Sequence, residues 1–163
     1  MGSMIRVLTY NTFLLQALLI EQLAIENNVF QNERVSLLVE NLASYDIVAL
    51  QEVWFPQDKG RKLELVKKAA KKGLSYHSLP AAEWPEDRTN DGGLLILSRY
   101  PIVERDFHAF RSSHLSHSLK GVLFARIKLE EDVFASIFNT HLEASYASLG
   151  EEDYLKTLEV RQK

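Results

Sequence analysis

The sequence predicts an α/β fold built around a mixed β-sheet. Strand-like and helix-like patterns alternate in the first half, and several strand-like patterns follow close together in the second half. The run Ile47–Leu50 is apolar throughout, which is typical of a strand buried on both faces. The 163 residues contain no internal repeat, low-complexity tract or Gly/Ser linker, so we expect one domain with a substantial core.

The first elements are predicted to be a strand and a helix. Ile5–Tyr10 is short and β-rich, which indicates a strand. Glu33–Ser44 is predicted to be an amphipathic helix because its apolar residues recur at spacings of three and four, namely Val35, Leu38, Val39 and Leu42. Asp46 ends this pattern before the buried strand. The apolar segment Phe13–Ile25 is interpreted as a buried or interfacial helix, because polar residues interrupt it before it reaches the ~18 apolar residues of a membrane span.

A second helix is predicted at Lys59–Lys72, with Leu63, Val66 and Ala70 on one side and lysines on the other. Gly73 stands at the position of its C-cap. Tyr76–Leu79 is predicted to be a short strand. Four further strands are predicted after the polar loop that follows it, at Leu94–Ser98, Ile102–His108, Val122–Lys128 and Val133–Asn139.

The connections between the later strands also have sequence signals. Pro101 marks a turn, and Glu130–Asp132 predicts a hairpin. Tyr154–Lys163 begins a last helix. We expect a single sheet made of Ile5–Tyr10, Ile47–Leu50, Leu94–Ser98 and Val133–Asn139.

The composition limits the classes of partner and site. The net charge of −3 and the isoelectric point of about 6.0 give no overall attraction to nucleic acid, so tight nucleic-acid binding is not expected. The chain has no cysteine, which excludes disulfides and thiolate metal sites but leaves a cytoplasmic or a secreted location open. Residues 1–4 are interpreted as a vector-derived N-terminus, so any signal peptide would lie outside this chain.

Polar residues able to contact metal or phosphate stand at the ends of several predicted strands. Glu52 follows the buried run directly, at the strand end where α/β folds tend to bind ligands, and Mg²⁺ prefers such oxygen ligands. Asn11 ends the first strand, and His141 ends the last one. Asp91 precedes the glycine pair that opens another strand. Each residue taken alone also fits an ordinary surface, turn or packing role.

Five segments together resemble the endonuclease/exonuclease/phosphatase superfamily of Mg²⁺-dependent phosphodiesterases. The segments are YNTF at Tyr10–Phe13, ALQEVW at Ala49–Trp54, DGGLLILSRYPI at Asp91–Ile102, KGVLFARI at Lys120–Ile127 and FNTHLEA at Phe138–Ala144. The pair Lys120–Gly121 is similar to the neutral sphingomyelinase branch of this superfamily. The resemblance implies that residues 5–163 form the N-terminal part of a four-layer α-β-β-α sandwich, truncated at its C-terminal end.

The resemblance also implies roles for individual residues. Glu52 would be the principal ligand of Mg²⁺ (or Mn²⁺), with Asn11 as a further metal or phosphate contact. His141 would contact the phosphoryl group, and Asp91 would pair with it, fix its tautomer and raise its pKa. Lys120 and Gly121 would lie near the substrate. Trp54 is interpreted either as a wall of the substrate site or as packing.

The superfamily takes its general base from a Gly-Asp-x-Asn segment and a C-terminal Asp-His pair. Neither Gly-Asp nor Asp-His occurs in these 163 residues, so we expect this chain alone to be inactive. A single sheet would also leave an apolar inner face open, so we expect a complementary C-terminal half or a second copy to cover it.

The resulting prediction is a phosphodiesterase resembling neutral sphingomyelinase, which cleaves a phospholipid-type phosphodiester and has a possible peripheral membrane contact. Two alternatives remain open. One is a nuclease or inositol-phosphate phosphatase of the same superfamily, and the other is a non-catalytic fragment that acts as an interaction or folding module.

Overall fold

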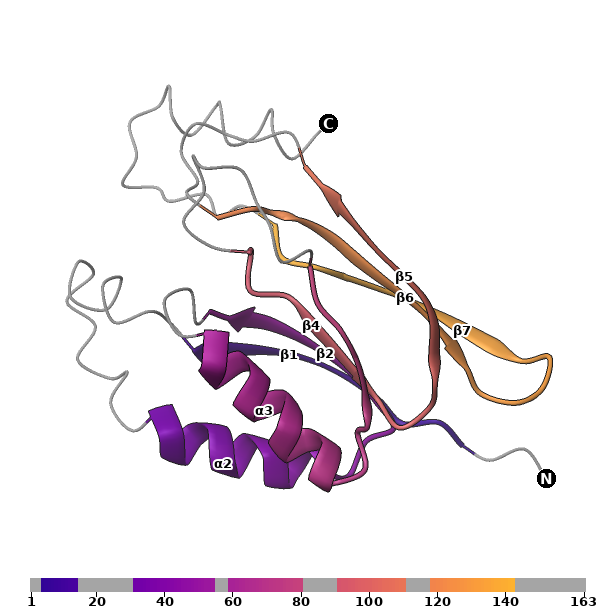
Figure 1. The fold of residues 1–163 in the computed structure, drawn as a ribbon, viewed down its shortest axis with the longest axis horizontal. Helices are drawn as coiled ribbons and strands as arrows, with labels where there is room; N and C mark the ends of the chain where they lie inside the picture. The colour runs from indigo at the N-terminus through magenta and orange to yellow at the C-terminus, as the bar shows by residue number, and fades with distance from the viewer. Residues whose placement is uncertain (1–3, 15–30, 55–58, 81–90, 111–117, 143–163) are drawn as a thin grey trace.

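The computed structural model describes residues 4–14, 31–54, 59–80, 91–110 and 118–142, and these form three layers (Figure 1). One layer holds two helices, the next a four-stranded sheet, and the third a three-stranded sheet. The predicted α/β class with a mixed sheet is therefore confirmed. The helices predicted at Phe13–Ile25 and Tyr154–Lys163 fall almost wholly or wholly outside the described residues.

The four-stranded sheet has the order β1-β2-β4-β3. Its strands are β1 (Val7–Leu14), β2 (Ile47–Val53), β3 (Tyr76–Ser78) and β4 (Leu95–Ser98). β1 and β2 are parallel, whereas β4 pairs antiparallel with both β2 and β3, so the sheet is mixed. β1 and β2 continue beyond their predicted ends, which places Asn11 and Glu52 inside irregular strand ends rather than after them.

The three-stranded sheet is an antiparallel meander of β5 (Ile102–Ala109), β6 (Gly121–Lys128) and β7 (Phe134–Thr140). The predicted hairpin closes between β6 and β7, where Leu129 N donates to Val133 O at 2.8 Å. The prediction that the last strand joins the first sheet is wrong. Its place beside β6 is fixed by this local turn, and β4 already has β2 and β3 as neighbours.

Helices α2 (Gln31–Leu42) and α3 (Lys59–Lys71) cover one face of the four-stranded sheet (Figure 1). The predicted apolar stripe of α2 is confirmed, since its side chains pack with Val48, Leu50 and Leu95 of the sheet. The predicted face of α3 is confirmed for Val66 but wrong for Leu63, which is 46% exposed, while Leu65 is fully buried. α3 is rotated so that its buried side comprises Lys62, Leu65, Val66 and Ala69.

A second core lies between the two sheets. It contains Ile47, Leu94, Ile96, Leu123, Ala125 and Ile127, all at most 1% exposed. Because the side chains of a strand alternate, β2 sends Val48 and Leu50 to the helices and Ile47 to the second sheet. The prediction of a strand buried on both faces is thus confirmed.

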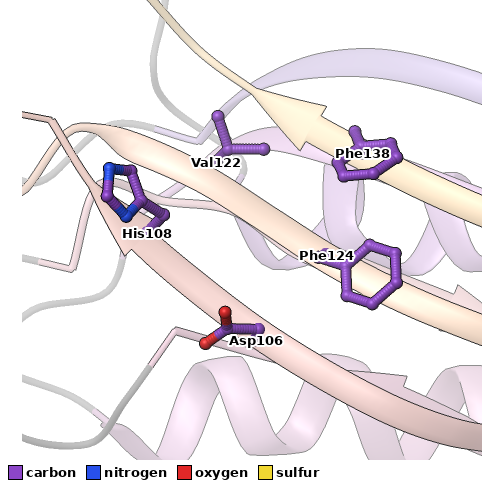
Figure 2. Close-up of a pocket in the computed structure, with 5 residues that line it drawn as sticks. All are labelled: Asp106, His108, Val122, Phe124 and Phe138. Atoms are coloured by element: carbon purple, nitrogen blue, oxygen red, sulfur yellow. The ribbon is translucent and has the colours of Figure 1, made fainter.

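The expectation of a fully open inner face is wrong, because β6 and β7 of the same chain pack on β2 and β4. Apolar exposure is found instead on the outer face of the second sheet, where Phe138 is 68% exposed. A hollow of about 410 Å³ lies on this face, and the rings of Phe124 and Phe138 that line it are 5.0 Å apart. Figure 2 shows these two rings side by side on neighbouring strands. The fourth layer of the expected sandwich stays a prediction.

Neither described helix has the length and apolarity that crossing a membrane requires.

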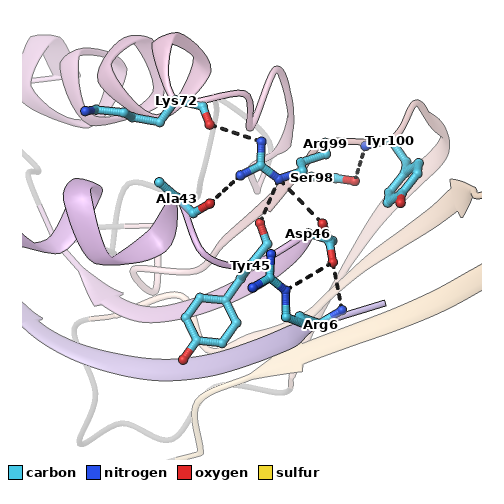
Figure 3. A network of polar contacts seen from close by, with 8 residues as sticks. All are labelled: Arg6, Ala43, Tyr45, Asp46, Lys72, Ser98, Arg99 and Tyr100. Carbon is cyan, nitrogen blue, oxygen red and sulfur yellow. Dashed lines mark hydrogen bonds and ion pairs between the residues drawn. The ribbon is translucent and has the colours of Figure 1, made fainter. Parts of the chain in front are cut away.

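The end of the four-stranded sheet opposite to Glu52 is tied to both helices by Arg99 (Figure 3). Its guanidinium group donates to the carbonyl oxygens of Tyr45 (3.0 Å), Lys72 (3.1 Å) and Ala43. These carbonyls follow the last turns of α2 and α3, so the cation also lies at the negative ends of both helix dipoles. Gly73 has a φ of 94°, and a Cβ at this position would collide with the Arg99 guanidinium. The predicted C-cap is confirmed, with Gly73 N donating to Ala70 O at 2.9 Å.

We predict that Arg99→Ala lowers the free energy of unfolding by about 2 kcal/mol or more, because three carbonyl oxygens lose a charged donor. The control Arg126→Ala removes an exposed arginine side chain whose ion pair to Glu104 measures 3.8 Å, and should cost less than about 1 kcal/mol. Urea unfolding followed by circular dichroism measures both. Equal losses in the two variants would contradict this account of Arg99.

Candidate active site

Three of the predicted site residues lie together where β1, β2 and β7 end. Asn11 Nδ2 donates to Glu52 Oε1 at 2.9 Å, and His141 Nε2 lies 3.4 Å from the same oxygen. Asn11 and Glu52 are 41 residues apart in the sequence, and His141 is farther from both. The arrangement of the strands therefore brings the three side chains together. The structure therefore forms a compact polar cluster of a carboxylate, an amide and an imidazole.

The backbone at Glu52 is held in a conformation that an L-residue rarely adopts. Glu52 has a φ of 56° and Phe13, on the adjacent strand, a φ of 49°. Such left-handed geometry costs roughly 1–2 kcal/mol at a non-glycine residue. The buried Thr12 hydroxyl group lies 3.0 Å from both Gln51 O and Glu52 O, which supports this turn. Arg34 of α2 donates to Thr12 O at 2.8 Å and to Phe13 O at 3.2 Å, so the helix layer secures the strand end.

One oxygen of Glu52 has partners and the other does not. Oε1 faces Asn11 and His141, whereas Oε2 is buried and has no hydrogen-bond partner among the described residues. A buried carboxylate oxygen without a donor is costly unless a cation completes it. The donor set thus fits Mg²⁺, which takes hard oxygen ligands and often uses only one or two carboxylates.

The rest of a metal shell is not provided by acidic or imidazole groups in the described part of the chain. No cluster of three or more His, Asp or Glu residues occurs there. Asn11 Oδ1 accepts a bond from Phe13 N at 3.0 Å and keeps a second lone pair. Asn11 and Glu52 therefore offer a partial shell.

His141 lies between a cation and the Glu52 carboxylate. Lys120 Nζ is 3.0 Å from Nδ1, and because an ammonium group can only donate, Nδ1 must accept and the neutral ring carries its proton on Nε2. Burial lowers the pKa of His141, Lys120 lowers it further, and Glu52 opposes them. The net shift of this pKa is therefore downward, opposite to the rise that the resemblance implied for a histidine paired with Asp91.

Asp91 is not the partner of His141 that we expected. Its Oδ2 forms an ion pair of 2.5 Å with Lys62 of α3, and its Oδ1 accepts from Gly93 N at 3.1 Å. Both side chains are largely buried, with 18% of Asp91 and 10% of Lys62 exposed. Lys62 lies on the buried side of α3, and through Asp91 it holds the turn that leads into β4.

The glycine pair makes room for an aromatic side chain beside the cluster. Gly92 and Gly93 have φ values of 76° and 71°, and a Cβ on Gly93 would collide with the indole of Trp54. The Trp54 ring lies 5.9 Å from the His141 ring and 5.4 Å from Lys120 Nζ. Trp54 thus contacts the predicted site residues from one side. Gly121 begins β6, where a Cβ would collide with His108 O and the Phe107 ring.

Three polar residues that support the cluster have no role in the predictions from sequence. Lys62 belongs to the lysine side of the predicted helix, and Gln51 and Asn139 lie within two of the segments that resemble the superfamily. Asn139 had a signal, because it continues the inward row of β7 after Ala135 and Ile137, where an apolar residue is expected. A polar side chain at such a position requires internal partners.

Comparison with known proteins shows what the chain is similar to. The Endonuclease/Exonuclease/phosphatase family matches residues 8–160. A sphingomyelinase of Dictyostelium discoideum is 33% identical over 78% of this chain and 30% of that protein. A sphingomyelinase C of Bacillus cereus is 29% identical over 90% of this chain and 45% of that protein. The chain therefore spans less than half the length of these relatives.

Solved structures show the same fold. The beta toxin of Staphylococcus aureus, crystallised with bound magnesium ions, matches with a TM-score of 0.69 and 22% identity over 89% of this chain and 51% of that one. A sphingomyelinase C of Streptomyces griseocarneus matches with a TM-score of 0.63 and 22% identity over 88% and 50% of the two chains.

We predict that the free energy of unfolding of Glu52→Gly is about 1 kcal/mol higher than that of Glu52→Ala, although glycine is normally the less stable of the two in a strand. The reason is the φ of 56°, which glycine adopts without strain. Denaturant unfolding of the two variants tests this directly. An alanine variant as stable as the glycine variant would show that position 52 relaxes to an ordinary strand.

Proposed function

This chain belongs to the endonuclease/exonuclease/phosphatase family, and we propose that it forms the metal-binding part of a Mg²⁺-dependent phosphodiester hydrolase. The substrate we propose is a phospholipid-type phosphodiester, cleaved by water. Relatives named as sphingomyelinases support this class of substrate. Because the chain spans only 30% to 45% of those relatives, the activity is proposed for the whole protein.

The observation that carries the proposal is the unpartnered, buried oxygen of Glu52 beside Asn11. We assign Glu52 and Asn11 to a site for Mg²⁺ (or Mn²⁺). A relative in fold is described with bound magnesium ions, which supports the choice of metal. When bound, such an ion supplies positive charge that stabilises phosphoryl oxygens.

The remaining cluster residues are assigned to the phosphate group. His141, with its proton on Nε2, is a donor for a phosphoryl oxygen, and Lys120 supplies a positive charge beside it. Gly121 lets β6 start close to this point, so that the Lys120 stem reaches His141. Asp91 enters the proposal only as the residue that holds the Gly92–Gly93 turn through Lys62.

Two other functions make different predictions. A nuclease or inositol-phosphate phosphatase would use the same cluster on another phosphate, and the net charge of −3 disfavours a tight nucleic-acid binder. An interaction or folding module would need no metal. Peripheral membrane contact and cover by a complementary half or a second copy also remain proposals for the whole protein.

We predict a divalent-ion site of about millimolar affinity, since the described ligands supply only part of the shell. Titration with Mn²⁺ should broaden the amide signals of Asn11 and Glu52 first, and Mg²⁺ should compete. Glu52→Gln should abolish the effect. Glu104→Gln removes an exposed carboxylate on β5 and should leave it intact. Broadening that is equal in both variants would assign the ion to general surface carboxylates.

We also predict that the 163-residue chain alone does not hydrolyse sphingomyelin above background, because it lacks the expected general base. Loss of that group alone typically costs about 10²–10⁴-fold. The assay measures phosphocholine release from sphingomyelin vesicles with Mg²⁺ present. Steady turnover that Glu52→Ala abolishes would overturn the assignment of the base to another part of the protein.

A further inference from the structure

Asn139 is a buried polar residue that joins the two sheets directly. It lies in β7 of the second sheet and is 2% exposed. Its Nδ2 donates to Leu50 O of β2 at 2.8 Å and to Leu95 O of β4 at 3.2 Å. Its Oδ1 accepts from Gln51 Nε2 at 2.7 Å. One amide group thus uses both of its N–H donors and its oxygen across the inter-sheet core.

Gln51 extends this link to a third strand of the first sheet. Its Nε2 also lies 3.1 Å from Thr9 Oγ1 of β1 and 3.3 Å from Ala49 O. β1, β2 and β4 are therefore all connected to β7 through two side-chain amides. The apolar core between the sheets has no directional preference, so these directional bonds favour one position of β7 against β2 and β4.

The linked residues stand close in sequence to the site residues. Asn139 is two residues before His141, and Leu50 is two residues before Glu52. His141 comes from the second sheet and Glu52 from the first, yet their side chains meet at 3.4 Å. A displacement of β7 along β2 would therefore move the His141 side chain away from Glu52.

A purely structural role for Asn139 makes a different prediction. An apolar side chain of similar size would then lower the stability, because Leu50 O and Leu95 O would lose a buried donor. These two residues would still keep their pairing between β2 and β4. The distance between Glu52 and His141 would not depend on it.

We propose that Asn139, supported by Gln51, is a positioning residue that fixes His141 against Glu52 and so determines the geometry of the metal and phosphate site. The inference rests on the proposed function for the identity of that site. Asn139 and Gln51 would act through hydrogen bonds between the sheets and would not contact metal or substrate.

The test uses the full 163-residue chain and three variants. Asn139→Leu removes all three bonds of the amide at similar size. Gln51→Met removes the Gln51 amide, with its contacts to Asn139, Thr9 and Ala49, and leaves the two carbonyl bonds of Asn139. It therefore keeps the test usable if the first variant does not fold. Asn41→Ala is the matched control, because Asn41 is an exposed asparagine of α2 whose side-chain amide donates to Leu37 O of the same helix.

Two readouts are measured beside the unfolding free energy. The first is the Mn²⁺ concentration that half-broadens the Glu52 amide signal. The second, in metal-free protein, is the nuclear Overhauser effect between the His141 and Trp54 rings, whose centres lie 5.9 Å apart. We expect Asn139→Leu to weaken Mn²⁺ binding by about 10-fold or more and to remove the ring contact, as loss of an outer support of metal ligands commonly does. Gln51→Met should have a smaller effect on both, and Asn41→Ala none.

Each outcome decides a separate point. Lower stability with unchanged Mn²⁺ affinity and unchanged ring contact would make Asn139 a structural residue only and would overturn the inference. Absence of Mn²⁺ broadening in the unaltered chain would overturn the proposed metal site instead. In that case the ring contact still tests the positioning role, since it is measured without metal.

Discussion

The structure depends on the burial of β2 on all sides. β1 and β4 occupy its two edges, the helices pack on one face, and β6 and β7 pack on the other. Each backbone group of Ile47–Leu50 therefore has to find its partner inside the protein, and each side chain has to fit a closed space. The positions of the other strands of the first sheet and of both helices depend on packing against β2 or against the strands beside it.

The same burial explains why the polar cluster forms near the C-terminal end of β2. Gln51 and Glu52 are the first residues after four fully or nearly fully buried ones, so their side chains meet the ends of neighbouring strands rather than bulk water. The unusual backbone at Glu52 persists because Thr12 and Arg34 satisfy the carbonyls around it. Strain at a polar position of this kind, held by surrounding hydrogen bonds, is a common property of functional sites.

The sequence was sufficient for the type and approximate bounds of the described elements, because periodicity reports which side of an element is buried. It also pointed to Asn11, Glu52 and His141, which the fold brings together. It was insufficient where a choice of partner was needed. Whether β7 pairs with the first or the second sheet depends on a hairpin and on occupied edges, and both possibilities have the same alternating pattern. The ion pair of Lys62 with Asp91 joins two residues that each fit a solvated role, so only the rotation of α3 reveals it.

The contrast between the two sheets has a consequence for how the chain reaches this structure. In the second sheet, β6 and β7 are joined by a short turn. The loss of chain entropy on pairing these two strands is therefore small. The parallel pair β1–β2 instead joins residues 7 and 47 across an intervening helix, and β2–β4 joins residues 47 and 98. Contacts of such high sequence separation form slowly. The meander is thus the part best suited to form early, and its apolar inner row would offer a surface on which the more distant strands assemble.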